Sequence, residues 1–423
     1  MSVMAVWLAL ASALPATSAV LEVPHSEYRA RREALAKALP VGVTILFGRA
    51  ETDNDDLRSG FYQESNFAYL SGWLEPGAVL LIEPRENAPS REIIFLPQRD
   101  ATKERWTGHK TAPDDANARE LTGFDTVMPM EKLEAEVKSS LDRLRIVYTV
   151  GDPSMASLKV LAPLRPVENA APAIARLRMH KSTREIEMLQ HSADATIAAH
   201  RAAWRRATPG MFEYQVAALM TQVYFDQGCQ RSAYAPIVGS GPNATILHYS
   251  RNARRIDRGE LLLMDVAAEC AGYAADVTRT VPVGAPFDKR QREIYDIVLG
   301  AQNAVIAAVK PGALIGKNSP GSLYRIAFDY INTHGQDLHG EPLGKYFIHG
   351  VSHHVGLDVH DAWDPETPLE EGMVITVEPG IYIPEENLGV RIEDMVLVTK
   401  DGARVMTSAL PREPGDIEKA IGR

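Results

Sequence analysis

A repeated order of helices in the second half of the chain restricts its fold more than any other feature. An amphipathic helix is predicted for residues 186–204, and Pro209-Gly210 ends it before a second predicted helix at 213–226. The same order recurs at 289–309 and 321–333, again with Pro-Gly between the two helices. β-type segments follow each pair. Two copies of this pattern predict a duplicated α+β unit with pseudo-twofold symmetry.

Acidic residues interrupt apolar β-type runs at four places in this half, namely Asp265, Asp276, Glu378 and Glu393. Unpaired carboxylates are rare inside such runs. If the strands around Asp265 and Asp276 fold back symmetrically about a turn near Cys270-Ala271, the two aspartates lie directly opposite each other, about 5 Å apart. A solvent-facing hairpin is the alternative. It suits Asp276 but not Asp265, whose strand is apolar on both faces.

Four of the twelve histidines fall within one stretch of twelve residues, namely His349, His353, His354 and His360. Imidazole binds metals and transfers protons near neutral pH. A solvated His-rich loop is the alternative interpretation. The nearby carboxylates favour a site with one histidine ligand and one or two acid/base groups. Arg391 shares a strand face with Glu393 and is expected to pair with a site carboxylate or to form a plain surface salt bridge.

Four carboxylates and one neutral imidazole carry a formal charge of −4, which two divalent cations would cancel. Oxygen-rich ligation without thiolate favours Mn²⁺ over a structural Zn²⁺. Two such ions can share a bridging water and lower its pKa, as in enzymes that hydrolyse amides or phosphates. The absence of a Gly-rich phosphate loop makes phosphate chemistry the weaker prediction.

The chain of 423 residues is long enough for two or three domains. Residues 22–165 alternate β-type and helical segments and are predicted to form an N-terminal α/β domain. A Pro/Ala-rich linker is predicted to follow, and the catalytic domain to span 174–423. A net charge of −10 without a basic stripe argues against nucleic-acid binding.

The apolar run within residues 3–14 is too short to span a membrane, and small residues follow it. We interpret residues 1–19 as an export signal peptide, which would make the protein periplasmic or secreted. The alternative is an apolar N-terminal tail or a misassigned start, in which case the protein would be cytoplasmic. No other segment is expected to span a membrane. Cys229 and Cys270 are interpreted as buried thiols, with a disulfide between them as the alternative.

The order of the predicted ligands resembles that of the pita-bread metallopeptidases, the group of methionine aminopeptidase, prolidase and aminopeptidase P. The string from His349 to Asp361 is similar to the aminopeptidase P signature in particular. The N-terminal half also resembles that family, in Gln63-Glu-Ser-Asn-Phe-Ala-Tyr-Leu-Ser-Gly72 and Trp106-Thr-Gly108. Two positions depart from the pattern: Cys270 stands where an aromatic residue is more usual, and Tyr62 where Arg is common.

The resemblance implies a pita-bread catalytic domain that binds two Mn²⁺, and an N-terminal domain that helps form dimers or tetramers. It implies the following roles: Asp265 binds one metal, Asp276 and Glu393 bridge both, His353 and Glu378 complete the other shell, His248, His360 and Glu378 handle protons, and His349 and Arg391 face the substrate. The motif register selects His353, not its neighbour His354, as the ligand.

The activity implied by the resemblance is removal of the N-terminal residue from peptides whose second residue is proline, by a hydroxide that bridges the two metals. Two alternatives remain. One is a prolidase, which cleaves only Xaa-Pro dipeptides. The other is a binding protein of this fold that has lost catalysis, which the complete set of ligand types disfavours.

Overall fold

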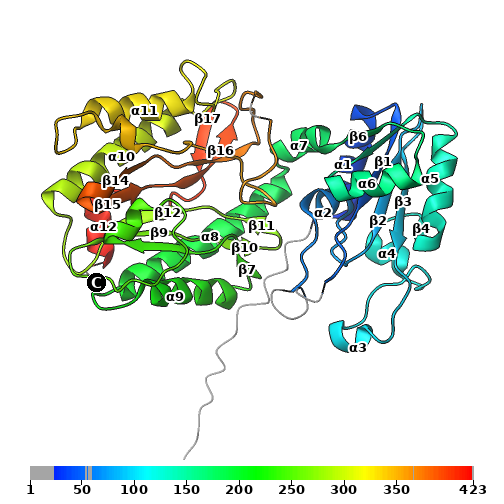
Figure 1. Ribbon diagram of the computed structural model, residues 1–423, viewed down its shortest axis with the longest axis horizontal. Helices are drawn as coiled ribbons and strands as arrows, with labels where there is room; N and C mark the ends of the chain where they lie inside the picture. Colours follow the sequence, from blue (N-terminus) through cyan, green and yellow to red (C-terminus); the bar gives the residue numbers. More distant parts are fainter. Residues whose placement is uncertain (1–22, 53–54, 56–59, 365, 422–423) are drawn as a thin grey trace, which may run out of the picture.

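The computed structural model describes residues 23–52, 55, 60–364 and 366–421. Figure 1 shows an N-terminal domain and a larger C-terminal domain side by side, with helix α7 (Ala171–Met179) between them. The predicted signal peptide, residues 1–19, lies outside the described residues. Within the described ranges, no helix is both long enough and apolar enough to cross a membrane.

The N-terminal domain is built on a six-stranded mixed sheet of order β4-β3-β2-β1-β5-β6. Its elements are α1 (His25–Ala38), β1 (Gly42–Phe47), α2 (Ser65–Ser71), β2 (Val79–Glu83), β3 (Arg91–Leu96), α3 (Glu104–Thr107), α4 (Ala118–Thr122), β4 (Val127–Pro129), η2 (Met130–Lys132), α5 (Leu133–Leu141), β5 (Ile146–Thr149), α6 (Asp152–Leu161) and β6 (Val167–Asn169).

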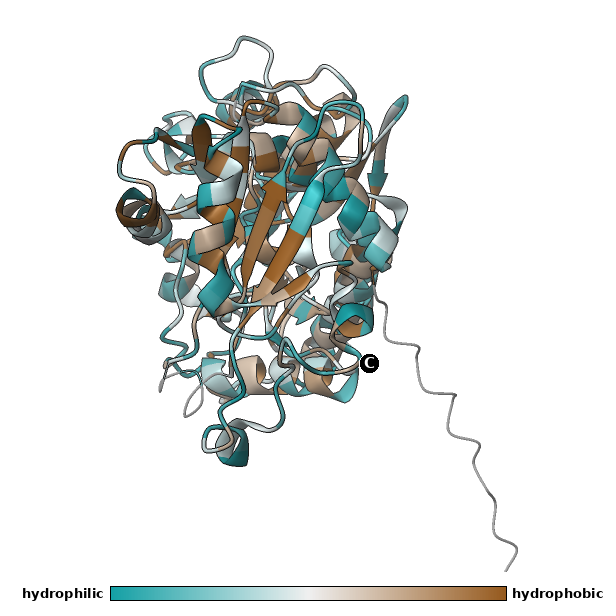
Figure 2. Ribbon diagram, turned by 90° about the vertical axis from the view of Figure 1, so that its right-hand side faces the viewer, coloured by the Kyte–Doolittle hydropathy of each residue, from teal (hydrophilic) through white to brown (hydrophobic). Residues whose placement is uncertain are grey.

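Both faces of this sheet are buried, because successive strand residues point to opposite sides. Leu80 of β2 faces a core formed with α1, α2 and α7, while its neighbour Leu81 faces a core formed with α5 and α6. Figure 2 views the molecule from the side of this domain and shows apolar strands surrounded by helices of mixed hydropathy. This arrangement confirms the predicted α/β class.

The Pro/Ala-rich segment that we predicted to be a linker is regular structure. Val167–Asn169 forms strand β6, which pairs in parallel with β5, and α7 follows directly. The sheet therefore extends beyond residue 165. The strand was not predicted because it has only three residues, which are too few to show the alternation of apolar and polar residues that indicates a strand.

The C-terminal domain contains two successive sets of helices and strands. The first set is α8 (Thr183–Arg206), α9 (Glu213–Asp226), β7 (Arg231–Ser232), β8 (Ile237–Ser240), η3 (Gly241–Thr245), β9 (Leu261–Asp265), β10 (Ala268–Cys270), β11 (Tyr273–Ala274) and β12 (Thr278–Pro282). The second set is α10 (Lys289–Ala308), α11 (Leu323–His334), η4 (Leu343–Tyr346), β13 (Val374–Val377), β14 (Gly380–Ile383), η5 (Pro384–Glu386), β15 (Leu388–Arg391), β16 (Asp394–Thr399), β17 (Gly402–Val405) and α12 (Pro414–Ile421).

The duplicated pattern in the sequence is present in the structure. Each set begins with a helix that carries a capping box at Ser182 or Asp288, and a second helix follows a Pro-Gly pair. A buried ion pair joins the two halves, since Arg279 of β12 donates to Asp394 of β16 at 2.7 Å and neither side chain is exposed. The amide of Gln302 on α10 also donates to Asp394, at 2.9 Å.

The hairpin that carries the first two aspartates differs from the prediction in its register. Its turn lies at Ala271-Gly272, both with positive φ (52° and 79°), one residue later than predicted. Asp265 therefore pairs with Thr278 rather than with Asp276. The shift of two residues keeps both aspartates on the same face, because strand side chains alternate with a period of two. They are diagonal neighbours instead of direct ones.

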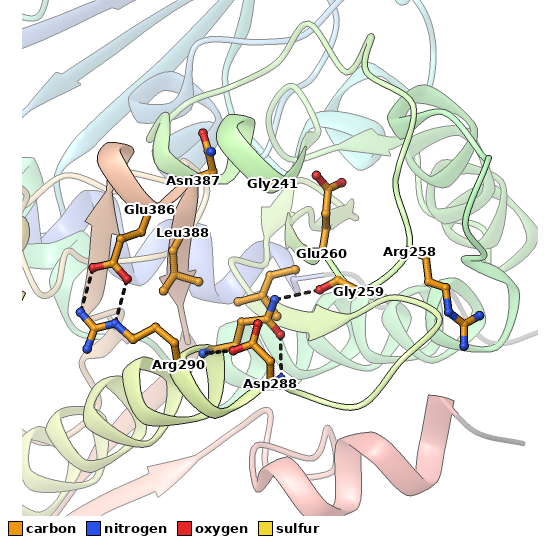
Figure 3. A pocket seen from close by; sticks show the side chains of 11 residues that line it. Gly241, Arg258, Gly259, Glu260, Asp288, Arg290, Glu386, Asn387 and Leu388 are labelled. Atoms are coloured by element: carbon orange, nitrogen blue, oxygen red, sulfur yellow. Dashed lines mark hydrogen bonds and ion pairs between the residues drawn. The ribbon is translucent and has the colours of Figure 1, made fainter. Parts of the chain in front are cut away.

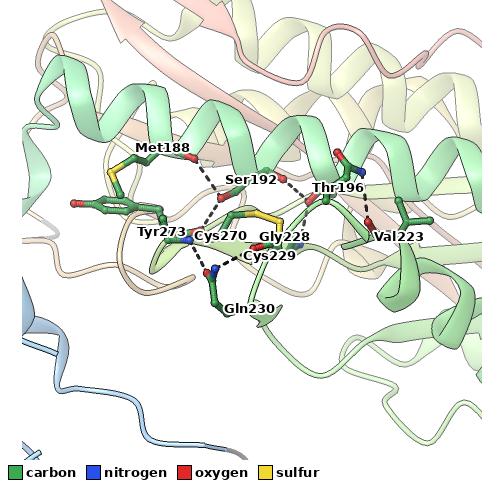
Figure 4. Close-up of a disulfide and its surroundings, with 12 residues drawn as sticks. Met188, Ser192, Thr196, Val223, Gly228, Cys229, Gln230, Cys270 and Tyr273 are labelled. Carbon is green, nitrogen blue, oxygen red and sulfur yellow. Dashed lines mark hydrogen bonds between the residues drawn. A yellow bond between two sulfur atoms is a disulfide. The ribbon is translucent and has the colours of Figure 1, made fainter. Parts of the chain in front are cut away.

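Cys229 and Cys270 form a disulfide, so the preferred interpretation as free thiols was wrong and the alternative holds. Strand β7 pairs with β10, with Arg231 opposite Glu269, and this pairing brings the two cysteines together. Figure 4 shows the disulfide beside helix α8. It fastens the segment after α9 to the hairpin that separates Asp265 from Asp276.

Candidate metal centre

The predicted ligands lie where the strands of the two halves end. Asp265 is the last residue of β9, and Asp276 precedes β12. Glu378 directly follows β13, and Glu393 lies at the bend between β15 and β16. His353 is in the loop before the bridge between His354 and Ile375. The fold thus brings together residues that are up to 128 positions apart in the sequence.

Three of these residues form a tight cluster of donor atoms. One ligand atom each from Asp276, His353 and Glu393 lies within 4.8 Å of the others. His353 Nε2 is 3.3 Å from Asp276 Oδ2 and 3.4 Å from Glu378 Oε1, so Glu378 joins the cluster. Tyr234 connects the fifth residue, because its hydroxyl donates to Asp276 at 2.7 Å and also to Asp265.

Three carboxylates of this cluster have a pKa above the ordinary value for their side chain. Burial raises the pKa of Asp265, Glu378 and Glu393, and the charge of Asp276 raises each of them further. For Glu378 the pKa rises to about 7. Buried like charges of this kind repel each other unless a cation lies among them. Oxygen donors with a single imidazole therefore fit hard or borderline divalent cations.

His353 responds to the same charges. Burial alone would lower the pKa of its imidazole, but the hydrogen bond to Asp276 and the negative charge of Glu378 outweigh burial and raise it to about 9. Its Nδ1 lies 3.0 Å from the carbonyl oxygen of His354, which leaves Nε2 directed at the carboxylates. With its proton removed, Nε2 would be available to bind a divalent cation.

His354 has a different environment from its neighbour. It is buried against Trp363, with ring centroids 5.6 Å apart, and burial lowers the pKa of its imidazole to about 3. The structure therefore places His353, and not His354, beside the carboxylates, in agreement with the motif register.

Arg391 is buried beside the cluster and is not a surface salt bridge. Its guanidinium donates to Asp265 at 2.6 Å and to the hydroxyl of Tyr382 at 2.8 Å, which confirms the expected pairing with a site carboxylate. The Tyr382 hydroxyl also lies 2.8 Å from Nε2 of His349. Burial, together with the charge of Arg391, lowers the pKa of His349 to about 3, so its imidazole is neutral at physiological pH.

A cavity of about 230 Å³ opens onto the carboxylates. Asp265 and Asp276 form part of its wall, and His248 and His360 line it with Tyr234, Ala235, Ile237, Ser250 and Val359. The His360 ring lies 4.2 Å from that of His353. The two histidines expected to handle protons therefore face the same space as the ligands.

A larger hollow of about 340 Å³ lies elsewhere and contains none of the predicted site residues. Figure 3 shows its charged side chains, among which Arg290 pairs with Glu386 at 2.8 Å. Glu260, also in its wall, pairs with Arg254. These charged side chains pair with one another and are not directed at a common point, as the predicted ligands are. The smaller cavity is therefore the better candidate for the active site.

Sequence reasoning missed three hydroxyl groups that hydrogen-bond to the predicted ligands. The hydroxyl of Tyr234 bridges two aspartates, and Thr278 donates to Glu393 Oε2 at 2.6 Å. Thr376 donates to Glu378 Oε1 at 3.2 Å. Thr278 and Thr376 each lie two residues from an acidic ligand, which is a readable signal because such residues share a strand face. Tyr234 lies in a segment without any such signal.

The comparisons with known proteins agree with this geometry. Residues 187–400 match the model of Metallopeptidase family M24, and residues 28–148 match that of the aminopeptidase P N-terminal domain. The chain belongs to metallopeptidase family M24, whose members use divalent metal ions, and it is a hydrolase. The combination with the second domain confirms the resemblance to aminopeptidase P.

Similar proteins cover nearly the whole chain. The Xaa-Pro aminopeptidase of Escherichia coli (strain K12) is 32% identical, and the match covers 94% of this chain and 98% of that protein. The Xaa-Pro aminopeptidase of Haemophilus influenzae is 35% identical, with 95% and 98% covered. The solved structure of aminopeptidase P from E. coli with the inhibitor Pro-Leu superimposes with a TM-score of 0.84 at 31% identity, covering 95% of this chain and 99% of that one.

Proposed function

We propose that this protein releases the N-terminal residue from peptides whose second residue is proline. The observation that carries the proposal is the convergence of three buried carboxylates, the half-buried Glu378 and His353 beside a cavity lined by two histidines. The similar proteins named Xaa-Pro aminopeptidase support the choice of substrate. The bond before proline is a tertiary amide without an N–H, which general peptidases handle poorly.

The proposed metal ligands are Asp265, Asp276, His353, Glu378 and Glu393, which together carry the charge to hold two divalent cations. Asp276 and Glu393 would bind both ions, Asp265 one, and His353 with Glu378 the other. We favour Mn²⁺ because the donors are mainly oxygen. When bound, such cations polarise a carbonyl oxygen and make water acidic enough to supply hydroxide near neutral pH.

The remaining groups of the site would bind the peptide and move protons. Glu378, which is also one of the proposed ligands, would accept the proton of the attacking water and return it to the leaving proline nitrogen. His248 and His360 would hydrogen-bond the peptide and the tetrahedral intermediate. The neutral His349 and the buried Arg391 would orient the substrate, Arg391 chiefly by holding Asp265 and Tyr382 in place.

Prolidase activity is the less favoured alternative. The similar proteins are aminopeptidases, and the N-terminal domain matches that of aminopeptidase P. A peptide longer than a dipeptide separates the two activities, because the metal site is common to both. We also propose that the protein is a homo-oligomer, a dimer or a tetramer, as the resemblance to its family suggests.

The test combines metal analysis with three peptides. The purified protein, loaded with Mn²⁺, should release Arg from Arg-Pro-Pro and leave Arg-Ala-Ala intact, and it should cleave Gly-Pro much more slowly. Metal analysis should find about two divalent ions per chain, as in other paired-metal hydrolases. Cleavage of Gly-Pro alone would establish a prolidase, and a protein without metal or activity would refute the proposal.

A further inference from the structure

We propose that Arg178 is a positioning residue that holds the loop of His360 in place and connects it to the N-terminal domain. Arg178 lies on α7, outside the catalytic cavity, and the proposed metal ligands do not include it. The inference rests on the proposed role of His360 in catalysis.

The side chain of Arg178 is buried between the two domains, with 3% of its surface exposed. One guanidinium nitrogen donates to Asn66 of helix α2 at 2.8 Å. The other donates to Asp358 at 2.7 Å and also to Asp361. The planar guanidinium group of Arg178 therefore joins the N-terminal domain to two carboxylates of one loop in the catalytic domain.

Those two carboxylates lie on either side of His360 in the sequence. Asp358 is two residues before it and Asp361 directly follows it. Each has a second anchor. The hydroxyl of Ser65, also on α2, donates to Asp358 at 2.6 Å, and Lys181 donates to the buried Asp361 at 3.0 Å.

His360 has little else to hold it. His360 is exposed, and among the described residues no side-chain hydrogen bond to it is present. Its location is therefore set by the backbone of the loop. That backbone is compact, because Asp361 N–H donates to the carbonyl of His354 at 2.9 Å, and a Cβ at Gly356 would meet the Asp361 carboxylate at 2.2 Å.

The charges explain why this position needs arginine. Burial alone would raise the pKa of Asp361, but Lys181 and Arg178 outweigh burial and lower it, so the carboxylate stays ionised. Without Arg178, Asp358 would lose the cation that pairs with it, and Asp361 would keep only its ion pair with Lys181. A lysine offers a point charge rather than a fork, so it could not reach Asn66 and both carboxylates together. The loop would then lose its fixed distance from the metal ligands.

The experiment is a double-mutant cycle on the Mn²⁺-loaded full-length protein with Arg-Pro-Pro as substrate. Arg178→Met should lower kcat by roughly 10- to 100-fold, the loss expected when a catalytic group is misplaced by about 1 Å. KM should rise by less than kcat falls, because the displaced His360 would contact the tetrahedral intermediate more strongly than the bound peptide. Arg176→Met is the matched control, since that residue lies two positions earlier on α7, is exposed, and should leave kcat unchanged.

The decisive comparison is with His360→Ala. If Arg178 acts through His360, adding Arg178→Met to His360→Ala should lower kcat by less than about threefold, since coupled residues are not additive. Arg178→Lys should restore part of the kcat lost in Arg178→Met. A merely structural role would instead give the same loss in both backgrounds, and that result would overturn the inference.

A second variant keeps the test decisive if Arg178→Met does not fold. Asp358 is partly exposed, so Asp358→Asn should fold and give the same pattern with a smaller loss in kcat. Full kcat in Asp358→Asn would also overturn the inference. Failure of the proposed function is recognised separately, because then the wild-type protein would not cleave Arg-Pro-Pro, or His360→Ala would leave kcat unchanged.

Discussion

The disulfide between Cys229 and Cys270 should stabilise the fold without taking part in catalysis. The two residues are 41 positions apart, and a cross-link over a loop of that length removes conformational entropy from the unfolded chain worth about 4 kcal/mol. The double variant Cys229→Ser/Cys270→Ser removes the cross-link with little change in side-chain volume. For a domain of this size, the loss corresponds to a fall in Tm of roughly 8–16 °C.

The folded hairpin should survive the change. Strand β10 keeps its pairing with β7, and the ion pair between Arg231 and Glu269 at 2.8 Å is untouched. Gln230 also accepts a hydrogen bond from the backbone N–H of Ala271 at 2.6 Å, next to the turn. The proposed metal ligands on either side of the hairpin should therefore keep their positions, and kcat with Arg-Pro-Pro at 25 °C should stay within about twofold.

Denaturant unfolding of both proteins, with and without dithiothreitol, measures the effect. Reductant should lower the stability of the wild type toward that of the double variant and leave the variant unchanged. If the variant unfolds at the wild-type denaturant concentration, the cross-link does not act on the unfolded chain as calculated. If instead the folded variant binds Mn²⁺ less tightly than the wild type, the disulfide helps to position the aspartates and contributes to catalysis as well as to stability.

Four further predictions follow from the site and the core. Asp276→Asn should reduce bound metal and lower kcat/KM by at least ~10³-fold, the scale of a lost electrostatic group; full metal content by elemental analysis with normal turnover would rule out its ligand role. His353→Ala should lose metal and activity. His354→Ala should keep kcat, but its free energy of unfolding should fall by about 2–4 kcal/mol because the change leaves a cavity against Trp363. The reverse result would show that the motif register, which selects His353 as the ligand, is wrong. A chelator should abolish activity and added Mn²⁺ restore it, and activity that is insensitive to chelation would contradict the metal site. The pKa of His200 is lowered to about 3, mainly by burial and then by Arg279, so protons bind the unfolded state more tightly between pH 6.5 and 3. The free energy of unfolding should therefore fall by about 2 kcal/mol more in the wild type than in His200→Asn between pH 6.5 and 4.5, and equal slopes in the two proteins would exclude this cause.

Much of the fold and of the site could be predicted because the signals are local or periodic. Helix α9 has the predicted bounds, and α10 and α11 differ from their predicted ranges by one or two residues at their ends. Acidic residues in apolar strands pointed to the metal site because burial of an unpaired carboxylate is costly, whatever the fold. The predicted ligands converge in the structure for that reason.

The errors and omissions arose where the outcome depends on residues far apart or on one turn. The register of the aspartate hairpin depended on whether the turn lies at Ala271-Gly272, and a shift of one residue there moves every pair by two. The disulfide depends on the pairing of β7 with β10, and no local sequence pattern predicts that pairing. The link from Arg178 to Asn66 spans 112 positions and appears only once the domains are placed together.

The buried pair of Arg279 and Asp394 has a consequence for any attempt to divide the catalytic domain. One charge belongs to the first repeat and its partner to the second, and neither has access to water. Either repeat produced by itself would have to bring an uncompensated ion into its apolar interior, at a cost of several kcal/mol. Fragments cut between Pro282 and Asp288 should therefore be insoluble or unstructured alone and should become folded only when both are mixed, each completing the interior of the other.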